Sequence, residues 1–166
     1  PTDGLILLPT EVVVFQQGVG AMEQVPEWTK TANENLTTAA REMLQKDSRF
    51  RLLDLPALDD NTRETLREHV ELFKVIANEL AFTVKMGGKP FQKNRDYPDY
   101  RVGDGLRFLR EKTGARYACV LAGAEVRQTG GSIFFSVLMA AAAGVAVGGG
   151  GTYLYAGIID LQSGQV

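Results

Sequence analysis

The sequence is poor in cysteine, since Cys119 is the only one among 166 residues. A single cysteine excludes an internal disulfide, and the apolar run around it, RYACVLAG, is typical of a buried strand. We therefore predict that Cys119 is an unreactive core residue. A low cysteine content fits a cytosolic protein and also a periplasmic protein that avoids unwanted oxidation, so it does not select a compartment.

The chain also lacks a strong charge of either sign. Eighteen basic and twenty acidic residues give a net charge of −2, which excludes a broad cationic surface for nucleic acid. With 45% hydrophobic and 23% charged residues, the composition is that of a packed globular protein and excludes a disordered one. The length predicts a single domain, residues 1–166.

Residues that build catalytic and metal centres are scarce. His69 is the only histidine, and we expect it at the surface or boundary of a charged helix. Asp59 and Asp60 precede a helical pattern, which explains them as helix caps better than as an acid pair. No serine has the context of a nucleophile elbow. The sequence therefore predicts no catalytic residue, no metal site and no cofactor, and hence a protein that is not an enzyme.

The hydrophobic pattern predicts alternating strands and helices. Strands are expected at 4–16 with a break at Pro9, within 50–58 as a short strand closed by Pro56, at 116–125 and at 152–161, with a return strand after Gly164. Helices are expected at 28–46, from about 59 to 82, and at 103–112, the last capped by Asp104 and ended by Gly114. Residues 18–27 are expected to be a loop. This order predicts an α/β, single-domain layered fold with a mixed sheet packed by helices.

No charged residue occurs between Gln128 and Ile159. The apolar part, 133–147, offers fifteen residues before a run of glycines, whereas a spanning helix needs about 20. We expect the Gly/Ala-rich segment 131–151 to form a helix at 133–143 and a glycine link, buried or covered by a partner, with Phe134, Phe135 and Leu138 as candidate contacts. A membrane-inserted β-hairpin is the alternative.

An exposed connection is predicted at about 84–101, where prolines, glycines and mixed charge gather. Phe91, Tyr97, Tyr100 and Arg101 are candidate interaction residues, because aromatic and arginine side chains are common at interfaces. A solvated connector without a binding role is the alternative.

Several segments together resemble bacterial envelope proteins. They are ILLPTEVVVFQQGVG, EWTKTANENLTTAAREML, GDGLRFLREKTGARYACVLAGAE and GTYLYAGIIDLQSGQV. Their order is similar to that in uncharacterised envelope lipoproteins related in fold to the curli-secretion lipoprotein, to the lipoprotein activator of penicillin-binding proteins and to the N-terminal domain of the Tol translocation protein. The resemblance covers most of the chain. A lipoprotein begins at a lipidated cysteine, however, and this sequence starts at Pro1.

The resemblance implies a non-enzymatic, periplasm-facing domain, tethered upstream to the outer membrane, that acts through protein contacts in envelope assembly or secretion. Its partners would be envelope proteins or further copies of itself. A soluble, cytoplasmic small-ligand-binding domain or enzyme and an outer-membrane pore component are the alternatives.

Overall fold

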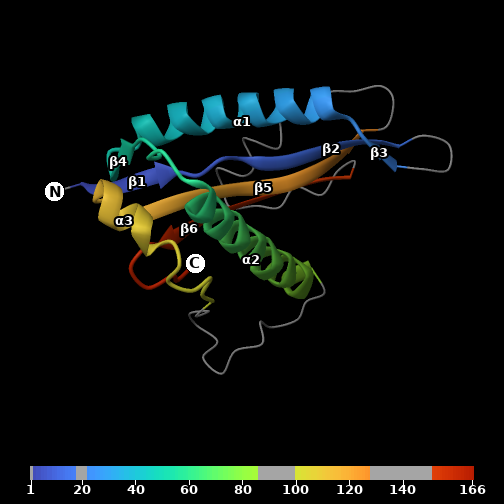
Figure 1. Cartoon of the computed structure of the whole chain (residues 1–166). Coiled ribbons are helices and arrows are strands. Elements are labelled where there is room, and N and C mark those ends of the chain that lie inside the picture. Colours follow the sequence, from blue (N-terminus) through green and yellow to red (C-terminus); the bar gives the residue numbers. More distant parts are fainter. Residues whose placement is uncertain (1, 18–21, 86–99, 128–150) are drawn as a thin grey trace. The chain divides into compact units, whose positions relative to one another are not determined.

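The computed structural model of the chain describes residues 2–17, 22–85, 100–127 and 151–166 (Figure 1). In this part of the chain, three helices accompany a six-stranded mixed sheet, which confirms the predicted α/β class. The chain divides into two compact units, each built from segments that are distant in sequence. The first unit contains residues 1–7, 48–119 and 157–166, and the second contains 8–47 and 120–156.

The first unit is built around a parallel strand pair. It contains β1 (Asp3–Leu7), β4 (Phe50–Leu53), α2 (Asp60–Lys85), α3 (Arg107–Thr113), the start of β5 (Tyr117–Arg127) and the end of β6 (Thr152–Asp160). Leu5 lies opposite Leu52 in β4 and opposite Tyr117 in β5. The buried apolar side chains of this unit are Leu5, Ile6, Leu7, Leu66, Val70, Phe73, Ile76, Val102, Leu106, Leu109, Ala115, Ala118, Cys119, Ile159 and Leu161.

Helix α2 begins where the sequence predicts. The Asp59 carboxylate accepts a hydrogen bond from the backbone N–H of Thr62 at 2.8 Å, which confirms Asp59 as a cap. This hydrogen bond also lowers the pKa of the Asp59 carboxyl. The helix ends at Lys85, beyond the expected end near Phe82, so residues 84 and 85 of the predicted connection are helical. Residues 60–86 contain no glycine or proline that would stop the helix earlier.

Helix α3 is shorter than predicted. Asp104 contributes no side-chain cap: its backbone carbonyl accepts the N–H of Arg107 at 3.0 Å, and the helix starts only at Arg107. Gly103 has a φ of 87°, so this part of the chain turns before the helix begins. Gly114 ends the helix in the left-handed region with a φ of 74°, as expected for a terminating glycine.

The C-terminal residues fold back after β6, as expected, but they form an isolated bridge and not a return strand. The Asp160 carboxylate accepts the backbone N–H groups of Gln162 and Ser163 at 2.8 and 3.0 Å, which forms a tight turn after β6. The Asp160 N–H donates to the Gln165 carbonyl at 2.9 Å. Gln165 then forms an isolated antiparallel bridge with Arg101, so the predicted return strand does not continue as a hairpin with β6.

The second unit contains a helix packed along a strand. Its elements are β2 (Glu11–Gln17), β3 (Met22–Gln24), α1 (Pro26–Lys46), the remainder of β5 and the start of β6. β2 runs parallel to β5, from Glu11 opposite Ala122 to Gln16 opposite Arg127, and α1 lies alongside β2 (Figure 1). Buried apolar side chains of this unit are Leu8, Val12, Val14, Ala32, Leu36, Ala40, Val120, Leu121, Ala122 and Ala124.

Two features of this unit bear on the sequence predictions. The break at Pro9 is confirmed, because β1 ends at Leu7 and β2 begins at Glu11. Strand β3 lies in the predicted loop 18–27, and it pairs antiparallel with β2 through Phe15 opposite Gln24. The helix predicted at 133–143 lies outside the described residues.

Candidate interaction surface

Helix α2 carries a second apolar face besides the one in the core. Leu72, Val75 and Phe82 are 42%, 64% and 66% exposed, respectively. With Glu79 they follow one another at steps of three, four and three residues, which places all four on one side of the helix. We call these four residues the outer stripe. Exposed apolar side chains gathered on one face indicate a contact surface more strongly than single ones.

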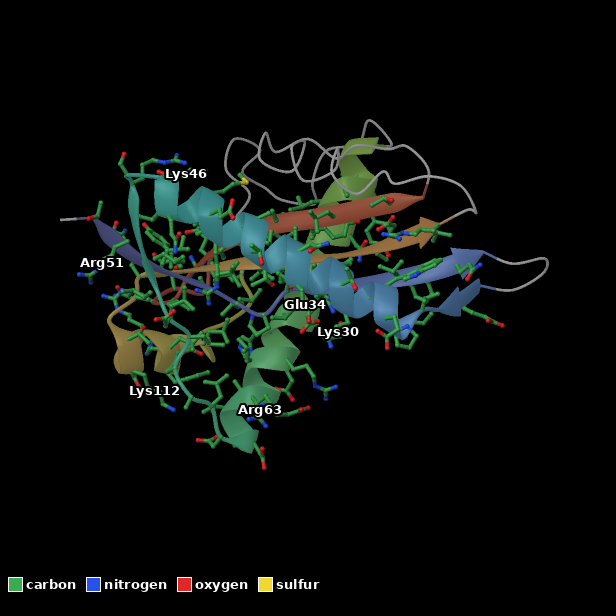
Figure 2. The ribbon with its side chains drawn as sticks, turned by 90° about the horizontal axis from the view of Figure 1, so that it is seen from above. Lys30, Glu34, Lys46, Arg51, Arg63 and Lys112 are labelled. Atoms are coloured by element: carbon green, nitrogen blue, oxygen red, sulfur yellow. The ribbon has the colours of Figure 1, made fainter. Side chains whose placement is uncertain are left out.

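The N-terminal half of α2 has a different outer surface. There, charged side chains pair three residues apart: Arg63 with Asp60 at 2.8 Å and Arg67 with Glu64 at 2.5 Å. Figure 2 shows Arg63 projecting from the first turns of the helix. Exposed pairs of this kind contribute little to stability, typically below about 1 kcal/mol, and they keep this half solvated. The exposed apolar residues of the outer stripe therefore begin at Leu72, beyond these charged first turns of the helix.

Tyr100, one of the predicted interaction residues, is tied to the outer stripe. Its hydroxyl donates to Oε2 of Glu79 at 2.7 Å, and the Thr83 hydroxyl donates to Oε1 of Glu79 at 3.1 Å. The hydrogen bond to this carboxylate, followed by burial, raises the pKa of Tyr100. Glu79 would otherwise place a charge between Val75 and Phe82, and the two hydroxyl donors satisfy it there.

The backbone next to Tyr100 is held by the end of the chain. The N–H of Val166 donates to the Tyr100 carbonyl, and the N–H of Val102 donates to the Gly164 carbonyl, both at 2.9 Å. Arg101 is exposed, and its backbone forms the bridge with Gln165. The half-buried Tyr100 is therefore a fixed part of the first unit. Phe91, Tyr97, Phe134, Phe135 and Leu138 lie outside the described residues.

The residues considered for catalysis occupy structural positions. Cys119 is only 9% exposed, as predicted, and burial raises the pKa of its thiol to about 11. A thiol with this pKa is protonated at neutral pH and is a poor nucleophile. His69 is half-buried, as expected of a boundary residue, and its Nδ1 lies 2.7 Å from the Thr65 carbonyl oxygen. No group of potential metal ligands occurs among the residues that the structure describes.

A buried acidic residue in the second unit was missed by the sequence interpretation. Glu125 on β5 is 2% exposed; its Oε1 accepts the Nε–H of Arg127 at 2.9 Å, and its Oε2 has no hydrogen-bond partner among the described residues. The Arg127 guanidinium lies over the Trp28 ring, 5.1 Å from the centroid. The signal in the sequence was a glutamate inside an apolar strand, followed by an arginine two residues later on the same face.

Comparison with known proteins adds no relative. No family model, curated protein or solved structure matches this chain at a significant level. Within the described ranges, the helices are too short or too polar to cross a bilayer. The outer stripe with Tyr100 is the strongest candidate site in the described part of the chain, because its apolar side chains are exposed on one face of α2.

Proposed function

We propose that this chain is the periplasm-facing domain of a bacterial envelope lipoprotein and that it acts through protein contacts in envelope assembly or secretion, not as an enzyme. The resemblance of its segments to envelope lipoproteins supports this function. A domain of this kind needs a contact surface rather than a reactive centre.

The observation that carries the proposal is the outer stripe of α2. Val75 and Phe82 each expose well over half of their surface, at 64% and 66%. The Glu79 carboxylate between them is bound by Tyr100 and Thr83. An apolar face with its one charge already satisfied loses little on desolvation, so it suits burial against another protein.

The partner that we propose for the outer stripe is a second copy of this chain. Leu72 and Phe82 lie at opposite ends of the stripe, about 15 Å apart at the helical rise of 1.5 Å per residue. Two copies related by a two-fold axis can therefore pack Leu72 of one against Phe82 of the other, with Val75 near the middle. The charged first turns of the two helices, residues 60–67, would then lie outside this contact.

Sedimentation velocity over a concentration series tests this pairing. The wild-type chain is expected to self-associate, and the double variant Val75→Ser, Phe82→Ser to remain monomeric, because the variant removes the two most exposed apolar side chains. Met43→Ser is the matched control, since Met43 is an exposed apolar residue, at 43%, on α1. A wild-type chain that is monomeric at the highest concentration, or a double variant that associates as the wild type does, would contradict the pairing.

The compartment is tested separately with the full-length gene product. We expect it to incorporate a radiolabelled fatty acid and to sediment with the outer membrane. A product that is unlabelled and remains in the cytosolic supernatant would overturn the envelope role, whatever the sedimentation result.

A further inference from the structure

One edge of β2 is covered by a helix where a neighbouring strand would usually lie. β2 pairs with β5 on one side, and β3 pairs with β2 only from Phe15 to Gln17. The backbone N–H and carbonyl groups of Val12 and Val14 point away from β5, because residues of a strand alternate in the direction of their backbone hydrogen bonds. All four of these groups bind α1 or the residue that precedes it.

Asn33 satisfies both backbone groups of Val12. Its Oδ1 accepts the Val12 N–H at 2.9 Å, and its Nδ2 donates to the Val12 carbonyl at 2.8 Å. Two residues that exchange an N–H···O bond in each direction form the hydrogen-bonded pair of an antiparallel ladder. The side-chain amide of Asn33 therefore takes the place that the backbone of a strand residue would occupy.

The neighbouring positions continue this arrangement. The Thr29 hydroxyl accepts the Val14 N–H at 3.0 Å, and the Val25 N–H donates to the Val14 carbonyl at 2.9 Å. The second Nδ2 hydrogen of Asn33 goes to the Thr29 carbonyl at 2.8 Å, which fixes the orientation of the amide. The amide thus uses both of its donors and its acceptor.

The next turn of α1 holds the start of the strand. The Thr10 hydroxyl donates to the Asn33 carbonyl at 3.1 Å and lies 2.9 Å from the Thr37 hydroxyl. Thr29, Asn33 and Thr37 are spaced four residues apart and form one polar row along the helix. Lys30 and Glu34 lie together on α1 outside this row, as a weak exposed pair 4.0 Å apart (Figure 2).

The covered strand has the composition of a segment that readily pairs with others. Between Glu11 and Gln17 it reads VVVFQ, without charge, proline or glycine. Uncovered strand edges with such sequences accept strands from other molecules. Natural proteins cover such edges, and here the cover is polar, so it matches the backbone groups themselves.

We propose that α1 guards the β2 edge against strand addition and that Asn33 is the positioning residue of this guard. When Asn33 no longer binds Val12, the edge accepts the β2 edge of a second copy. Two such edges are self-complementary, because a two-fold axis brings the Val12 and Val14 groups of one copy against the same groups of the other. This inference is independent of the envelope role, since it concerns only the second unit.

The test compares two asparagines of the same helix. Asn33→Leu removes the amide that binds Val12, whereas Asn35→Leu makes the same exchange at an exposed position of α1. Both are made in the Val75→Ser, Phe82→Ser background, so that pairing through the outer stripe does not contribute. Amide hydrogen exchange and sedimentation velocity are measured for each full-length variant.

We expect the protection of the Val12 amide to fall about tenfold or more in Asn33→Leu, relative to Leu36 in the same helix, because a lost hydrogen bond leaves this amide unsatisfied. We also expect Asn33→Leu to associate with rising concentration, and Asn35→Leu to do neither. Unchanged protection at Val12, or lost protection without association, overturns the proposal.

Asn33→Asp keeps the proposal testable if the leucine variant does not fold. The ionised carboxylate accepts the Val12 N–H but cannot donate to the Val12 carbonyl, whereas the protonated acid can donate again. Association of this variant is therefore expected at pH 7 and is expected to decrease toward pH 4. The reference at each pH is the Val75→Ser, Phe82→Ser protein with Asn33 intact. Association that is equal at both pH values, or no association at pH 7, contradicts the guard role.

Discussion

Removal of the Arg127 side chain tests the account of the buried glutamate in the second unit. Glu125 is 2% exposed and Arg127 32% exposed, and the Nε–Oε1 bond between them is 2.9 Å long. Breaking a buried pair by removing one partner typically costs 3–5 kcal/mol. Because Arg127 is partly exposed and solvent weakens the pair, we take the lower end, about 3 kcal/mol. Loss of the contact with Trp28 adds up to about 1 kcal/mol.

The variant is Arg127→Leu, which keeps an apolar side chain at the position, and its partner is the double variant Glu125→Leu, Arg127→Leu. Replacing both members of a buried pair by apolar groups is often neutral, so the double variant should lie within about 1 kcal/mol of the wild type. Urea unfolding followed by far-ultraviolet circular dichroism gives the free energies of unfolding. Trp28 is the only tryptophan, so a changed emission spectrum reports the lost contact directly.

The reasoning is refuted if Arg127→Leu costs less than about 1 kcal/mol, because Glu125 would then not depend on its partner. It is also refuted if the double variant is less stable than Arg127→Leu alone. That result would mean that the carboxylate is stabilised by its surroundings and not by the arginine.

Two further predictions concern the first unit. Gly164→Ala should lower the free energy of unfolding by about 1–2 kcal/mol, because Gly164 has a φ of 69° and an added Cβ would meet the Gly103 carbonyl; chemical denaturation measures this, and an unchanged midpoint would contradict it. The pKa of Cys119 is raised from 9.0 to about 11, so the buried neutral thiol contributes stability below pH 9 that is lost as the pH rises to 11. This loss amounts to about 2–3 kcal/mol, and it should be absent in Cys119→Ala. Urea unfolding of both proteins across this pH range measures it. If the free energy of unfolding falls equally with pH in the two proteins, the thiol is not the cause.

Much of the fold could be predicted because long periodic patterns carry most of the local information. Helix α1 and strands β4, β5 and β6 lie within a few residues of their expected bounds. For each of them, the apolar spacing and the flanking residues predict the same element. Strand β3 could not be predicted in this way. It has three residues and exists only because β2 provides a partner, which is a tertiary effect.

The candidate sites were predicted less well, for physical reasons. Tyr100 was selected for its residue type, but its link to the outer stripe depends on Glu79, twenty-one residues earlier in the chain. The exposed stripe on α2 overlaps the core pattern of the same helix, so the sequence favours only the buried face. The row that contains Asn33 has helical spacing but is polar, and a search for apolar periodicity passes over it.

The central claim is that the outer stripe of α2 contacts protein in the cell envelope, and site-specific photo-cross-linking in living bacteria tests it most directly. A photoreactive amino acid is placed at Phe82 and, as control, at Met43, which is also exposed and apolar. The account predicts adducts at Phe82 with a second copy of the chain and none of that kind at Met43. No adduct at Phe82, or the same adducts from both positions, would contradict it.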